Sequence, residues 1–158
     1  FISQDALVFR MTNAVCESQN KSWVVVNECR LRVVGRNKII FNFNGKLLQP
    51  TNSIMVHVQA FKRANGYKPW LLNYTIDGCR FLRKSYNPFA IYIHSIYISF
   101  TNFNHTCPYS GDQIVNGFYL QVDMLKGLPI PNGDYLLAMN WYFYEKKQFT
   151  TNLYYTFT

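Results

Sequence analysis

Apolar and polar residues alternate along most of this chain with a period of two, which is typical of β-strands. In residues 54–60, for example, apolar side chains occupy the even positions, while His57 and Gln59 occupy odd ones. Comparable segments lie near residues 7–11, 23–34, 39–44, 70–76, 118–122, 135–143 and 149–157. About eight strands of this kind predict an all-β fold, an antiparallel β-sandwich.

A glycosylation sequon indicates which way one of these strands faces. Asn73 and Thr75 belong to an Asn-x-Thr sequon, and a glycosylated Asn must face solvent. Because neighbouring side chains of a strand point to opposite faces, the residues of the other parity must face the core. Those residues are Trp70, Leu72, Tyr74 and Ile76.

Two Asn-Gly pairs interrupt the alternation in different ways. Asn65 and Gly66 lie between two strand-like segments and predict a hairpin turn. Asn44 and Gly45 have alternation on both sides, so we favour a bulge or a glycine within a strand over a hairpin at that point.

One segment, near residues 87–101, has the spacing of a helix instead. An Asn followed by a Pro, at positions 87 and 88, suits a helix start. Large apolar residues then recur at helical spacing, at Phe89, Ile93, Ile96 and Phe100. The segment is also rich in β-branched isoleucine, which lowers helix propensity, so a strand stays the alternative. We expect one mostly buried helix inserted into the sandwich.

The chain has 158 residues and a formal net charge of +8. This length suits one domain, so we expect residues 1–158 to fold around a single core. Two stretches concentrate the positive charge, residues 30–38 and residues 80–84. They indicate either a solvated basic face or attraction to an anionic partner such as lipid head groups or glycans. No nucleic-acid recognition signature is present, and we expect no nucleic acid as a partner.

Three sequons and an even number of cysteines point to the secretory route. The sequons begin at Asn20, Asn73 and Asn104, and each lies near a cysteine. Glycosylation and disulfide formation both take place outside the cytosol, so we expect a secreted, extracellular glycoprotein. No apolar run of about 20 residues is present to span a membrane. No signal peptide is visible either, and we expect a mature form or an expressed piece whose leader is absent.

Four cysteines allow three pairings. The most economical one joins Cys16 to Cys29 and Cys79 to Cys107. The second of these bonds would span the predicted helix and anchor both of its ends. No Cys-x-x-Cys spacing supports a zinc site.

Several motifs resemble a large insect family of secreted proteins, catalogued as domain of unknown function 1091. They include Asn73-Tyr-Thr-Ile-Asp-Gly-Cys-Arg-Phe-Leu82, Asn87-Pro-Phe, Asn104-His-Thr-Cys-Pro-Tyr109, Leu128-Pro-Ile-Pro-Asn-Gly-Asp-Tyr135, Cys29-Arg-Leu-Arg-Val-Val-Gly35, Lys46-Leu-Leu-Gln49 and the final Tyr155-Thr-Phe. That family is similar to the CheB-type chemosensory proteins and, through them, to the ML lipid-recognition domains such as the ganglioside-activator protein. The resemblance covers nearly the whole chain.

The resemblance implies an immunoglobulin-like, ML-type β-sandwich whose two sheets splay apart around an apolar cavity. It also implies secretion, a small hydrophobic or lipid-like ligand and a role in pheromone or taste perception or in lipid presentation. Alternation alone does not indicate a cavity, because a filled sandwich has the same pattern. The candidate cavity residues are Phe41, Phe43, Trp70, Leu72, Tyr74, Ile93, Ile96, Phe100, Met139 and Trp141. An anionic head group would meet Arg80, Arg83 and Lys84, with a membrane receptor or an anionic lipid surface as a further partner.

The residues that could perform chemistry are scattered. The histidines share no metal-ligand spacing, and no acidic pair or nucleophile motif is visible. We expect His57 and His105 at the surface and His94 in the core with a hydrogen bond. The sequence therefore predicts no enzyme, metal or cofactor. The first hypothesis is a carrier of a hydrophobic ligand, the alternative is an extracellular protein or glycan interaction module with a filled core, and a hydrolase is the third.

Overall fold

A computed structural model describes residues 8–36, 38–84, 88–120 and 130–158. In these residues the elements, in chain order, are β1 (Phe9–Ser18), β2 (Val24–Gly35), β3 (Lys38–Thr51), β4 (Met55–Ala64), β5 (Gly66–Asp77), α1 (Gly78–Arg83), α2 (Pro88–Tyr97), the 3-10 turn η1 (Ile98–Phe100), β6 (Tyr109–Phe118), β7 (Gly133–Phe143) and β8 (Lys146–Phe157).

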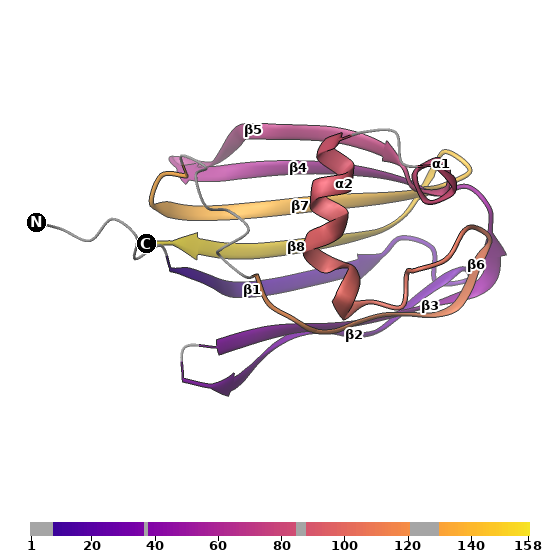
Figure 1. Cartoon of the computed structure of the whole chain (residues 1–158), viewed down its shortest axis with the longest axis horizontal. Helices are drawn as coiled ribbons and strands as arrows, with labels where there is room; N and C mark the ends of the chain where they lie inside the picture. Colours follow the sequence, from indigo (N-terminus) through magenta and orange to yellow (C-terminus); the bar gives the residue numbers. More distant parts are fainter. Residues whose placement is uncertain (1–7, 37, 85–87, 121–129) are drawn as a thin grey trace, which may run out of the picture.

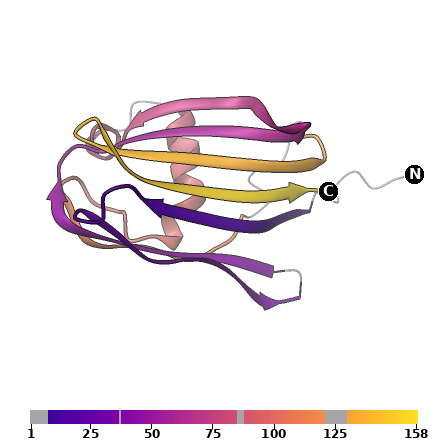
Figure 2. The same ribbon diagram turned by 180° about the vertical axis from the view of Figure 1, so that it is seen from behind.

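The strands form two antiparallel sheets. Five strands pair in the order β1-β8-β7-β4-β5, and three pair in the order β2-β3-β6. Helix α2 crosses the five-stranded sheet on one face (Figure 1), and the view from behind shows no described element over the other face (Figure 2). After η1 the chain bridges to β6 at Thr101 and Val115, so the end of the helical segment is attached to the three-stranded sheet. The predicted all-β sandwich with one inserted helix is confirmed.

The packed core lies where the two sheets meet. Phe43 of β3 and Phe149 of β8 stack across the interface with ring centroids 6.3 Å apart, and both side chains are buried. The other fully buried members of this cluster are Met11, Val24, Phe41, Leu47, Tyr109, Phe143 and Leu153. A smaller second cluster surrounds Tyr135 and Phe157. Burial of these large side chains supplies most of the driving force for folding.

Both predicted disulfides are present. Cys16–Cys29 joins β1 to β2, which are edge strands of the two different sheets. Cys79–Cys107 joins α1 to the segment before β6, across a sequence separation of 28 residues. The enclosed loop contains α2 and η1, so this second bond tethers the helical segment at both ends, as predicted.

The strand β5 has the predicted orientation. Asn73 and Thr75 are exposed and pair with Gln59 and His57 of β4 on the outer face. The predicted turn is also present, because β4 ends one residue before Asn65 and β5 begins one residue after it.

Gly45 lies inside β3 and is buried, which confirms the mid-strand interpretation. A Cβ atom at this position would lie only 2.7 Å from Cζ of Phe43. The ring of Phe43 is packed against Phe149 and has little freedom to withdraw. The absence of a side chain at Gly45 is therefore what lets this ring enter the core.

We predict that Gly45→Ala lowers the free energy of unfolding by roughly 1–3 kcal/mol, because overpacking displaces the Phe43 ring. The matched control is Gly35→Ala at the end of β2, where a Cβ atom would meet nothing within 4 Å. Chemical denaturation of both variants checks the prediction. Equal stability of the two variants would contradict it.

Two elements differ from the sequence-based expectation. A strand was predicted near residues 118–122, but β6 runs over Tyr109–Phe118, and residues 121–129 lie outside the described part of the chain. Gly111 and Gly117 adopt positive φ angles of 72° and 70°, and these irregular positions break the alternation that would reveal the strand. The six-residue helix α1 was not predicted because so short a helix has almost no periodicity.

Candidate functional site

The candidate site is the part of the five-stranded sheet that α2 crosses. Register places apolar residues of three strands side by side on this face. Val56 pairs with Ile76 and Trp141, and Val58 pairs with Tyr74 and Met139. We call this surface the inner face, and its residues are Val56, Val58, Ala60, Leu72, Tyr74, Ile76, Leu137, Met139 and Trp141.

The inner face is less buried than the packed core. Of its residues only Ala60 is fully buried, and Tyr74 on the edge strand β5 is 38% exposed. Val58 and Met139 are half-buried and lie opposite each other on the neighbouring strands β4 and β7. Leu137, Met139 and Trp141 pack against the core cluster, and the ring of Trp141 stacks on Phe149 at 5.4 Å. The half-buried Val56, Val58 and Ile76 are not among the described residues that pack against this cluster.

Helix α2 contributes both apolar and polar groups. Ile93 and Ile96 are half-buried, and His94 lies between two rings, with centroids 5.3 Å from Phe81 and 5.5 Å from Tyr97. The prediction of a hydrogen-bonded His94 is wrong for Nε2, which is buried without a hydrogen-bond partner among the described residues. Burial lowers the pKa of His94, so the imidazole is neutral at pH 7 and can donate or accept a hydrogen bond.

The C-terminal end of α2 is held against the three-stranded sheet by aromatic residues. Burial and the neighbouring Tyr109 raise the pKa of Tyr97 to about 12, so its hydroxyl stays neutral. The hydroxyl of Tyr109 donates to the carbonyl of Phe103 at 3.1 Å. Phe100 packs edge-on against Phe118 of β6 at 5.4 Å. Together with the disulfide Cys79–Cys107, these contacts fix the end of the helix.

The ten predicted cavity residues fall into three groups. Phe41 and Phe43 are each 5% exposed and belong to the packed core. Trp70 packs edge-on against Tyr135 at 4.9 Å, in the second cluster. The remaining seven lie on the inner face or on the segment that crosses it, namely Leu72, Tyr74, Met139, Trp141, Ile93, Ile96 and Phe100.

Sequence reasoning missed four half-buried members of the inner face, namely Val56, Val58, Ile76 and Leu137. The alternation of β4 and β5 placed three of these side chains on an apolar face. It did not show which strands are neighbours, because the β4–β7 pairing joins segments about 80 residues apart in sequence.

The predicted basic cluster lies beside the inner face. Arg80 and Arg83 belong to α1, Lys84 follows it, and all three side chains are exposed. Asp77 caps this helix, because its Oδ1 accepts a hydrogen bond of 3.0 Å from the backbone N–H of Arg80. Phe81 of α1 contacts His94 of α2, so the positive charge lies close to the helix that crosses the site.

The three sequons differ in accessibility. Asn73 and Asn104 are exposed, and Oδ1 of Asn73 lies 2.6 Å from Nε2 of His57 on the outer face. Asn20 is half-buried, and its Oδ1 accepts hydrogen bonds from the N–H and hydroxyl of Ser22. His105 is exposed as predicted and stacks on Tyr109.

Two open surface hollows are lined by described residues, and both lie near the disulfide Cys16–Cys29. Neither includes a residue of the inner face or a predicted cavity residue. Within the described ranges, no group of three His, Cys, Asp or Glu side chains could hold a metal ion. No helix in the same ranges is long and apolar enough to cross a membrane.

A comparison with known protein families matches the part of the chain that contains most of this site. Residues 56–137 match the family described as Protein of unknown function (DUF1091). The chain belongs to the DUF1091 family. The DUF1091 segment covers β5, both helices and β6, so it contains most of the inner face and the whole tethered loop. No curated protein matches the chain.

Proposed function

We propose that this DUF1091 protein is a secreted glycoprotein that binds a small hydrophobic or lipid-like molecule between the inner face and α2. It acts by sequestration, without turnover. The observation that carries the proposal is the partial exposure of the apolar residues Val56, Val58 and Ile76 on the inner face, outside the packed core cluster. A ligand that covered these side chains would gain roughly 0.8 kcal/mol for each CH₂ group it buries.

The surroundings of the inner face suit an amphiphilic ligand. The Nε2 atom of His94 is the polar group that would meet a hydroxyl or carbonyl of the ligand. Arg80, Arg83 and Lys84 would meet an anionic head group at the edge of the site. The helix α2, held by Cys79–Cys107, would act as the lid.

The proposal includes extracellular placement and a relationship to the CheB-type and ML lipid-binding proteins of insects. It is supported by two disulfides that pair all four cysteines and by exposed sequons at Asn73 and Asn104. Within that relationship, the role would be chemosensory or lipid presentation, with a membrane receptor as the partner.

A second candidate function is an extracellular interaction module with a filled core. It is favoured by the tight packing of Phe41 and Phe43 and by the position of both hollows outside the inner face. The two functions differ in whether space remains beside Val58.

The variant Val58→Phe separates these functions. If space is present, we expect the larger ring to fill it, to abolish binding of a fluorescent apolar probe and to leave the free energy of unfolding nearly unchanged. If the interior is already filled, we expect a loss of roughly 1–3 kcal/mol from overpacking and no probe binding by the wild type.

The matched control is Val24→Phe, because Val24 is fully buried in the packed core. It should lose roughly 1–3 kcal/mol under either function. Probe titration, thermal denaturation and native mass spectrometry of mildly extracted protein supply the readouts. A destabilised Val58→Phe together with a wild type that binds no probe would overturn the carrier.

A further inference from the structure

The hairpin between β2 and β3 carries an exposed surface that the proposed ligand site does not use. Away from the Cys16–Cys29 disulfide, this hairpin diverges from β1 in both views (Figures 1 and 2). Seven exposed residues lie at its end, and we call them the β2–β3 tip. They are Arg30, Arg32, Val33, Val34, Gly35, Arg36 and Lys38.

The apolar residues of the β2–β3 tip are unusually exposed. Val33 is 72% exposed and Val34 is 47% exposed. Val33 pairs with Ile39, and the next pair on the same side of the hairpin is Leu31 with Phe41, which is 5% exposed. The apolar inner side of the hairpin therefore continues from the packed core into solvent, where no described element covers it.

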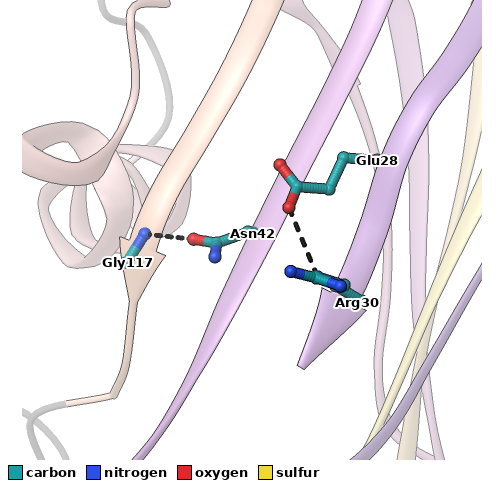
Figure 3. Close-up of polar contacts among 4 residues, drawn as sticks. All are labelled: Glu28, Arg30, Asn42 and Gly117. Carbon is teal, nitrogen blue, oxygen red and sulfur yellow. Dashed lines mark hydrogen bonds and ion pairs between the residues drawn. The ribbon is translucent and has the colours of Figure 1, made fainter. Parts of the chain in front are cut away.

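The same residues carry a concentration of positive charge. Four of the seven are Arg or Lys, and no acidic residue occurs between Glu28 and Asp77. Glu28 lies 3.4 Å from Arg30 (Figure 3). No ion pair within the described residues involves Arg32, Arg36 or Lys38, and Lys38 lies over the ring of Tyr119 at 4.1 Å. A net positive charge is thus left around Val33 and Val34.

The base of the hairpin is held in place. Oδ1 of Asn42 in β3 accepts a hydrogen bond of 2.8 Å from the backbone N–H of Gly117 in β6 (Figure 3). With Cys16–Cys29 on the other side, both strands of the hairpin are attached to the sandwich. The β2–β3 tip therefore projects from a hairpin whose base is fixed to the sandwich.

We propose that the β2–β3 tip docks this protein onto an anionic lipid surface. Val33 and Val34 would enter the headgroup region, while Arg32, Arg36 and Lys38 contact lipid phosphates or carboxylates. A second copy of the chain is disfavoured, because a symmetric contact would bring two clusters of like charge together. A stable protein interface needs roughly 20–30 residues on each side, many more than this tip exposes.

Vesicle sedimentation with the full chain tests the proposal. We expect binding to phosphatidylcholine vesicles that contain about 30 mol% phosphatidylserine and little binding to phosphatidylcholine alone. Raising the salt from about 0.1 M to about 1 M should release the protein, because the Debye length falls from about 10 Å to about 3 Å.

Variants then assign the binding to the β2–β3 tip. Arg32→Gln with Arg36→Gln should weaken binding roughly 30-fold, since each basic residue near an anionic surface contributes about a factor of five. Val33→Ser with Val34→Ser should weaken it at least about tenfold, through lost apolar burial.

The control for charge is Lys146→Gln with Lys147→Gln. It removes the same formal charge from the β7–β8 turn, at the opposite end of the strands (Figure 1). Because that turn would lie beyond a Debye length from the lipid, binding should stay within about twofold of the wild type.

Three outcomes would overturn the proposal. Unchanged binding of either tip variant would show that the tip is not the contact, and binding that ignores salt or anionic lipid would exclude the electrostatic basis. Equal affinity for soluble polyglutamate would identify an acidic protein as the partner. None of these outcomes bears on the ligand site, because the tip shares no residue with the inner face and probe binding should persist in every tip variant.

Discussion

Replacing Cys79 and Cys107 together by serine is expected to lower the free energy of unfolding by about 3.6 kcal/mol and to accelerate ligand release. The chain-entropy model assigns about that value to a closed loop of the size set by their sequence separation of 28. The loop holds α1, α2 and η1, so the loss should fall mainly on the helical segment over the inner face. If about 1.4 kcal/mol of that free energy falls on opening of α2, probe dissociation should become about tenfold faster.

The matched control is replacement of Cys16 and Cys29 by serine. This bond joins two strands across a separation of 13, and its loss should cost about 2.9 kcal/mol in the same model. It does not enclose α2, so the dissociation rate of the probe should stay near the wild-type value. Stopped-flow displacement and denaturant unfolding measure the two quantities. Similar acceleration in both double variants would show that the Cys79–Cys107 bond has no special role in the lid.

Phe43→Ala is expected to lower the free energy of unfolding by roughly 3–5 kcal/mol, the usual range for truncating a buried Phe. The side chain is 5% exposed, stacks on Phe149 and Phe41, and occupies the space that Gly45 leaves open. Its removal would leave a cavity between the two sheets where neither backbone can easily collapse. Equilibrium denaturation checks the value.

Leu48→Ala provides the control on the same strand. Leu48 is 50% exposed, so its truncation should change the free energy of unfolding by about 0.5 kcal/mol or less. Phe43 also belongs to the predicted cavity residues, and probe binding decides its role. We expect the affinity of folded Phe43→Ala protein to match the wild type, and a large loss of affinity would place Phe43 in the ligand site instead.

Mutations where the two sheets meet and mutations on the face that α2 crosses should have different effects. Where the two sheets meet, side chains such as Phe43 and Phe149 pack ring against ring. On the face that α2 crosses, the helix contributes the half-buried Ile93 and Ile96, and sheet residues such as Val58 stay half-buried. Stability should therefore depend mainly on the first region, whereas ligand binding should depend on the second.

Local features were predictable because the sequence carries their signals directly. A few neighbouring residues were enough to predict three features correctly. These are the outward orientation of Asn73 and Thr75, the helix start at Pro88 and the glycine inside β3. The strand β6 was missed because Gly111 and Gly117 interrupt its alternation. His94 was expected to find a hydrogen-bond partner, but the rings of Phe81 and Tyr97 flank it, and no described residue forms a hydrogen bond with Nε2.

The amino-acid sequence by itself determined that the chain is mostly strands, where its turns lie and which parity of each strand is apolar, since these properties depend on residues adjacent along the chain. Only the tertiary structure decided that Val58 lies beside Met139, that α2 crosses the five-stranded sheet and that Val33 extends beyond the cover of the core. The physical reason is the separation in sequence of the residues that interact. Alternation has a period of two residues, whereas sheet order and burial depend on contacts between segments far apart in the sequence, and no local pattern encodes them.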